Sequence, residues 1–158
     1  MNKIENQILE TWRIHNRAMI YFIENLPEGA LAATLSTRGG RDVARQLAHA
    51  NNVRYKRLTA IAKKKGFKIV EFDTKESPDR ETLMSAFKQS GKAMEEHIKA
   101  AIDNDGLPSN FKLGVVPMLG YYISHECHHR GHALLTIKQA GIPLNDKLRM
   151  YIWDWKNI

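Results

Sequence analysis

The 158-residue sequence has a single cysteine, Cys127, and no long apolar run. One cysteine excludes an intrachain disulfide and favours a reducing compartment. The charge-free run near an apolar stretch, 113–124, is shorter than the roughly 20 residues that a membrane-spanning helix needs. Lys3 and Glu5 fall where a signal peptide would have its apolar stretch. These absences predict a soluble, cytoplasmic protein with no membrane partner.

Acidic residues are in deficit, since 24 Lys and Arg against 17 Asp and Glu leave a formal net charge of +7. Nucleic-acid binders often carry such an excess, clustered on one face. Here the cations are dispersed, and the densest cluster, 63–65, stands at the expected end of a helix, where cations complement the helix dipole. We interpret the charge as mainly solvating, so nucleic acid is not an expected partner.

No segment shows a convincing period-2 alternation, and 67–72 is too short and isolated to build a sheet. Four long segments have a helical period instead, at about 4–26, 41–65, 77–104 and 117–141. Together they predict an all-α four-helix bundle, formed by a single domain, 1–158. The tail 144–158 carries Tyr151, Trp153 and Trp155. We expect this aromatic tail to pack on the bundle or on a second subunit of a homodimer.

Four of the seven histidines lie within one stretch, 125–132. One face of the fourth predicted helix carries three of these histidines, and we predict that it points inward. Its residues are Met118, Tyr122, His125, His129, His132 and Thr136. Several imidazoles in an apolar core are costly without partners, but a divalent metal takes their neutral nitrogens as ligands. His125 and His129 stand at i and i+4, where one ion can reach both. His49, close to the apolar stripe of the second helix, is the best candidate for a third ligand.

The other histidines have plainer interpretations. His15 stands alone on the apolar face of the first helix, so we predict a satisfied core or boundary residue. His97 also stands alone and is predicted to lie on the surface. His128 is one position off the histidine face, which places it on a flank.

The string 125–129 also matches H-E-x-x-H, the zinc-protease helix in which the glutamate is the base. Gly131 and His132 come too soon for the longer form of that pattern, and no sheet is expected to hold a substrate strand. Glu126 is rotated about 100° from His125, toward a flank. We therefore interpret the match as coincidental. Glu126 is predicted not to be a catalytic base, and Glu126→Gln is predicted to leave the metal content unchanged and to cost little activity.

A second pattern covers essentially the whole chain. It consists of His49, in the stretch 49–54, and of His125-x-x-x-His129-Arg130-Gly131. The helix order and the long loop before the fourth helix also belong to it. In these features the chain resembles the DinB/YfiT-like family of four-helix-bundle metalloproteins. The resemblance implies that His49, His125 and His129 form a metal triad. Family members commonly have Gln where this chain has His132. This departure leaves open whether His132 is a fourth ligand, orients a ligand, or is a catalytic general base.

Some members of this family are metal-dependent thiol S-transferases that use a low-molecular-weight thiol such as bacillithiol, mycothiol or glutathione. The resemblance therefore implies a metal-dependent enzyme of the thiol S-transferase or hydrolase type, acting on a small-molecule substrate. Its triad would keep an open coordination position, and Zn²⁺ or Ni²⁺ is the expected ion. The alternative is a non-catalytic, stress-linked metal-binding bundle that acts through a partner or a dimer surface. A closed four-ligand site that includes His132 would favour this alternative.

Overall fold

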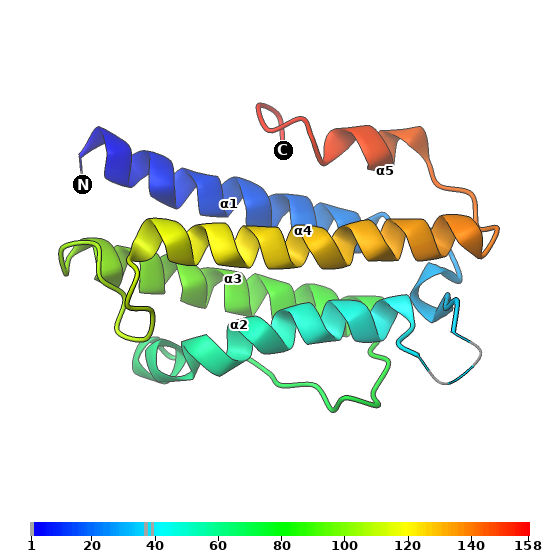
Figure 1. The fold of residues 1–158 in the computed structure, drawn as a ribbon, viewed down its shortest axis with the longest axis horizontal. Coiled ribbons are helices and arrows are strands. Elements are labelled where there is room, and N and C mark those ends of the chain that lie inside the picture. Colours follow the sequence, from blue (N-terminus) through cyan, green and yellow to red (C-terminus); the bar gives the residue numbers. More distant parts are fainter. Residues whose placement is uncertain (1, 37, 39) are drawn as a thin grey trace.

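The computed structural model describes residues 2–36, 38 and 40–158, and it confirms the predicted all-α bundle (Figure 1). The four long helices are α1 (Lys3–Glu24), α2 (Val43–Lys65), α3 (Arg80–Ile102) and α4 (Val115–Gln139), joined by the short elements η1 (Ala30–Ala32) and α5 (Asp146–Tyr151). The described residues contain no strand. None of the described helices has the length and hydropathy needed to cross a bilayer.

Side-chain caps set where the helices begin. The Asp42 carboxylate accepts a hydrogen bond from the Arg45 backbone N–H at 2.7 Å, so α2 begins two residues later than the predicted position 41. Asp79 caps α3 in the same way through Thr82, which moves its start beyond the predicted position 77. At the other end of α2, Gly66 has a φ of 74°, a left-handed conformation that ends the helix readily only with glycine.

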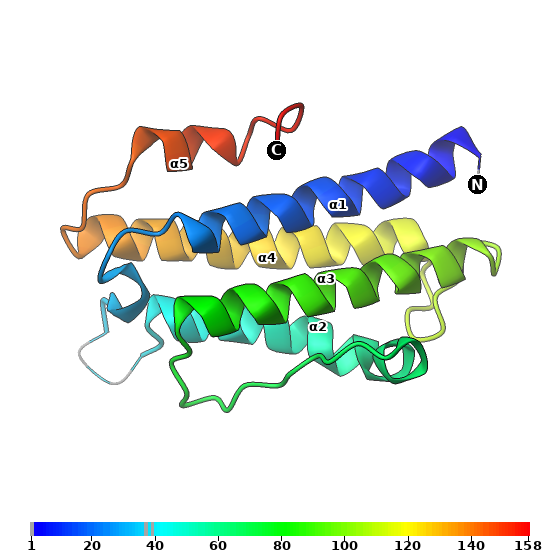
Figure 2. The same cartoon turned by 180° about the vertical axis from the view of Figure 1, so that it is seen from behind.

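The order of the helices around the bundle places α2 next to α4. Both α1 and α2 pack mainly against α3, while α4 packs against α2 and less closely against α1. Figures 1 and 2 show α1 and α4 running in one direction and α2 and α3 in the other. The connection 66–79 therefore runs back along the bundle, and Asn52 on α2 holds it. The Asn52 side chain donates to the Phe72 carbonyl at 2.8 Å and accepts from the Phe72 N–H at 2.9 Å.

Two clusters of buried apolar side chains fill the bundle, one toward each end. The cluster near α5 includes Met19, Phe22, Leu47, Phe87 and Ile137, and the other includes Trp12, Leu58, Met94, Ile98 and Tyr122. In every long helix, polar residues stand between the contributions to the two clusters: His15 on α1, Arg54 on α2, Ser90 on α3 and Glu126 on α4, all buried. The middle layer of the core is therefore polar.

The C-terminal tail packs on the bundle, as predicted, although not through its tryptophans. Leu148 and Ile152 are buried in the cluster near α5, and the ring of Tyr151 lies 4.3 Å from that of Tyr21 on α1. Trp153 and Trp155 are exposed. Aliphatic side chains next to the aromatic ones therefore supply most of the buried contact.

Candidate metal site

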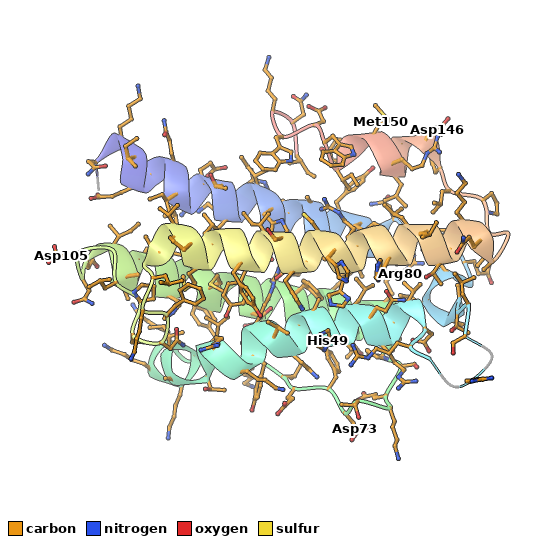
Figure 3. The ribbon with its side chains drawn as sticks, in the orientation of Figure 1. His49, Asp73, Arg80, Asp105, Asp146 and Met150 are labelled. Carbon is orange, nitrogen blue, oxygen red and sulfur yellow. The ribbon has the colours of Figure 1, made fainter. Side chains whose placement is uncertain are left out.

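The structure brings His49, His125 and His129 together. His49 lies on α2, the neighbour of α4 (Figure 3), and the other two stand on successive turns of α4. Each ring offers a nitrogen, and the three nitrogens lie within 4.8 Å of one another. The ring centroids are 4.6 Å apart for His125 and His129, 4.9 Å for His49 and His129, and 5.4 Å for His49 and His125. The three imidazoles can therefore reach a single ion.

The protonation state of the triad suits a metal. Burial lowers the pKa of all three histidines, and the neighbouring imidazoles contribute to lowering that of His129 to about 4. The rings are therefore neutral near pH 7. The Nδ1 atoms of His125 and His129 are buried and have no hydrogen-bond partner among the described residues. Unmatched buried nitrogens are costly unless a cation or a donor uses them. The donor set thus fits a divalent ion that prefers imidazole.

A cavity of about 430 Å³ borders the triad on one side. His129, His132, Arg41 and Gln46 are among its lining residues. His132 is exposed, and its ring lies 4.1 Å from that of His128, which is also exposed. His132 does not belong to the group of closely spaced ligand atoms. The prediction that it points inward with the triad is wrong, and it lies instead at the cavity beside His129.

The buried face of α4 agrees with the predicted one at Met118, Tyr122 and Thr136 but departs from it at the histidines. The core-facing residues are Tyr122, Glu126, Arg130, Ala133 and Ile137, which step by 4, 4, 3 and 4. His125 and His129 are only half-buried, at the margin of this face. Glu126, predicted on a flank, is 0% exposed. That placement was wrong because a matched ion pair allows a carboxylate to occupy the core.

The partners of Glu126 come from two other helices. Arg54 on α2 donates from Nε and Nη2 to the two carboxylate oxygens, each at 2.6 Å. The Nε2 atom of His15 on α1 lies 2.9 Å from one of the same oxygens. The remaining guanidinium nitrogen of Arg54 donates to the Asn16 side chain at 2.8 Å and reaches Ser90 Oγ at 3.3 Å. The buried charges are therefore paired bidentately, the geometry in which such a pair is strongest.

The network keeps the Glu126 carboxylate ionised and engages both of its oxygens in hydrogen bonds. Burial by itself raises the pKa of Glu126, but the charge and hydrogen bonds of Arg54, with those of His15, lower it to about 2. Both oxygens are engaged by Arg54 and His15. The carboxylate is thus held as a structural anion and is not free to take a proton from a nucleophile beside the triad.

Two further histidines can be compared with their predicted positions. His15 is a satisfied core residue, as predicted, because it is buried and bonded to Glu126. His97 was predicted on the surface, but it is buried and its Nε2 lies 3.1 Å from the Asn110 side-chain oxygen. A loop residue before α4 covers it, and helical periodicity alone does not predict such a contact.

Arg54 is a buried residue of the core that the sequence patterns above did not single out. A signal for it was present, because Leu47, Ala50, Arg54 and Leu58 share one face of α2 with spacings of 3, 4 and 4. A cation on an apolar face requires a buried anion. Its partner Glu126 stands on another helix, so neither segment by itself predicts the pair.

The comparisons with known proteins agree with this architecture. The chain matches the DinB family over residues 1–153, essentially its whole length. No curated protein and no solved structure matches it at a significant level. A whole-chain family match, together with the four-helix bundle and the triad of His49, His125 and His129, identifies this chain as a member of the DinB family.

Proposed function

We propose that this protein is a metal-dependent enzyme of the thiol S-transferase or hydrolase type. One divalent ion, Zn²⁺ or Ni²⁺, is held by His49, His125 and His129. The observation that carries the proposal is the convergence of three imidazoles from two helices. The buried Nδ1 atoms of His125 and His129 have no partner among the described residues. A bound divalent ion lowers the pKa of a thiol or water and keeps the resulting anion ready to attack.

The residues around the triad support an enzyme over a closed metal store. Of the three half-buried histidines, His129 lines a cavity of about 430 Å³, which is large enough for a small substrate. The Arg41 guanidinium at this cavity suits an anionic group on the substrate or on a low-molecular-weight thiol. His132 lies at the same cavity, so we assign it the role of accepting the proton that the thiol or water gives up. A fourth-ligand role for His132 would close the site and favour a non-catalytic function.

Metal analysis tests the binding step. Protein purified without a nickel column and reloaded with Zn²⁺ is expected to hold one equivalent of ion. The His125→Ala/His129→Ala double variant should lose it, and His49→Ala should weaken it. His128→Ala is the matched control, because His128 is an exposed histidine on the same helix, and it should bind like the parent chain. Full metal retention in the double variant would end the proposal.

Two assays test the activity. The metal-loaded chain is expected to catalyse either the attack of glutathione on an aryl chloride, with release of chloride, or the hydrolysis of an aryl ester. The apo chain should do neither. His132→Gln should keep the metal and lower the rate by about 10²- to 10⁴-fold, the range for loss of a general base. Metal-dependent folding stability with no turnover in either assay, across several thiols, would favour the non-catalytic alternative.

A further inference from the structure

A second cavity lies between α4 and the C-terminal tail, away from the triad. Its volume is about 400 Å³, and Leu134, Leu144, Ile152 and Trp153 supply much of its wall. At 100° per residue, Arg130 and Leu134 project from α4 at about 100° and 140° from His129. The two cavities therefore lie mainly on different faces of the same helix, although Leu135 lines both. Figure 1 shows α5 lying along the C-terminal half of α4, where this cavity is formed.

Arg130 lines this cavity, and none of the described residues offers it an anionic partner. Its side chain is only 6% exposed. Within the described part of the chain, its hydrogen-bond acceptors are two sulfur atoms, Met19 Sδ at 3.9 Å and Cys127 Sγ at 3.5 Å. Sulfur is a weak acceptor, and a guanidinium has five N–H donors to satisfy. A buried charge without a counter-charge is costly.

A comparison with Arg54 shows that this fold can supply a buried arginine with an anionic partner. Arg54 is also buried, yet it holds a carboxylate bidentately and three further oxygen acceptors. The same fold therefore satisfies one buried guanidinium fully and leaves the other with sulfur alone. An external anion that enters the cavity would supply the missing acceptors of Arg130.

The charge and polarity of the cavity indicate what kind of anion fits. Lys138 and Arg149 line it together with Arg130, and no acidic side chain of the described residues does. Arg149 pairs with Asp146, which is itself exposed. Arg130 and Lys138 have no acidic partner within the described part of the chain. The rest of the wall is mainly aliphatic and aromatic. A ligand complementary to this cavity has one anionic group and an apolar body.

We propose that the cavity between α4 and α5 binds a small amphiphilic monocarboxylate. Its carboxylate pairs with Arg130, and its apolar chain or ring packs against Leu134, Leu144 and Ile152. Trp153, which is 69% exposed in the protein alone, covers the apolar body. The site is independent of the metal triad and does not rest on the proposed function.

Two glycines on α4 offer a test that leaves Arg130 in place. A Cβ added at Gly131 or at Gly120 would meet nothing within 4 Å, so a larger residue fits at either position. Gly131 lines the cavity and Gly120 does not. Gly131→Leu should therefore fill the cavity without unfolding the chain, and Gly120→Leu is the matched control.

The experiment is a calorimetric titration of the full chain with octanoate and, separately, with 1-octanol. Octanoate is expected to bind one equivalent at least tenfold more tightly than 1-octanol. Gly131→Leu should weaken octanoate binding at least tenfold, whereas Gly120→Leu should leave it unchanged. Arg130→Met should remove the preference for octanoate over 1-octanol. The His125→Ala/His129→Ala variant should bind octanoate like the parent chain, which separates this site from the metal site.

Several results would overturn the proposal. One is equal binding of octanoate and 1-octanol by the parent chain. Another is octanoate binding that survives Gly131→Leu. A third is the absence of octanoate binding together with a dimer that Trp153→Ala dissociates, since a second copy of the chain would then be the occupant of this face.

Discussion

Helix α4 contributes adjacent residues to two polar clusters with opposite properties. Glu126 belongs to a network in which both carboxylate oxygens are bonded to Arg54 or His15. His125 belongs to a triad whose buried Nδ1 atoms on α4 have no partner among the described residues. The protein satisfies the first cluster by itself and leaves the second unsatisfied. Because buried polar groups are nearly always bonded, the first cluster indicates a structural role and the second indicates a ligand.

The largest expected loss of stability comes from a substitution in the cluster of Glu126, Arg54 and His15. Glu126→Gln leaves the Arg54 guanidinium buried without its anion, and loss of one partner of a buried pair costs about 3–5 kcal/mol of unfolding free energy. Urea unfolding measures this loss, and Arg54→Met/Glu126→Gln should recover part of it because neither charge remains. The sequence-based expectation for Glu126→Gln concerned metal content and activity, and the structure adds this loss of stability to it. A loss below about 1 kcal/mol would mean that the network does not stabilise the core.

The next largest effect is expected when a metal ion binds the triad of His49, His125 and His129. Free Zn²⁺ at 100 times its dissociation constant should raise the unfolding free energy by about 2.7 kcal/mol, because only the folded chain presents the triad. Thermal melts followed by circular dichroism measure this shift, which His125→Ala/His129→Ala should abolish. The chelated chain should remain helical, since both apolar clusters lie outside the triad. Loss of helical signal on chelation would contradict this expectation.

The two clusters should also titrate with opposite signs. The pKa of His129 is lowered by burial and by its imidazole neighbours from 6.5 to about 4. The unfolded chain then binds the proton first, so stability is lost as the pH falls from about 6.5 to about 4. Burial alone would lower the pKa of His15, but hydrogen bonds with Cys127 and Glu126 and the Glu126 charge raise it above 6.5. Its contribution is present below pH 6.5 and is lost as the pH rises through the raised pKa.

Proton NMR of the imidazole rings in the metal-free chain measures both titrations. The resonance of His129 should have a midpoint well below 6.5 and that of His15 a midpoint above it. His128→Ala, which removes an exposed neighbouring ring, should leave this separation in place. A common midpoint for His15 and His129 would show that the two clusters do not differ in this way.

The smallest expected loss of stability comes from breaking an arginine–glutamate pair at the surface, which tests how much burial contributes to the energy of such a pair. Arg13 Nη2 lies 2.6 Å from the Glu95 carboxylate, as close as Arg54 is to Glu126, but the Arg13 side chain is 40% exposed. This pairing, through the Arg13 hydrogen bond first, lowers the pKa of Glu95 to about 2. Arg13→Ala should nevertheless cost less than about 1 kcal/mol in urea unfolding, because water replaces the lost partner. A cost equal to that of Glu126→Gln would mean that distance and not burial decides the energy.

The helices and the triad were predictable for different reasons. Helix periods, capping residues and glycine stops are local signals, so four helices could be placed to within a few residues. His125 and His129 are also a local pattern, and only the family resemblance added His49 with the required specificity. The starts of α2 and α3 were missed by two or three residues because Asp42 and Asp79, rather than the residues before them, supply the caps.

The sequence by itself determined an all-helical chain with an i, i+4 histidine pair and one candidate imidazole on another helix. Only the tertiary structure decided which face of α4 is buried. From Tyr122 the helical spacing continues equally well to His125 and His129 or to Glu126 and Arg130, and the apolar pattern favours the histidines. Arg54 reverses the choice, because a guanidinium from α2 makes the Glu126 carboxylate the better core residue. The energy of that pairing exists only once the helices are side by side.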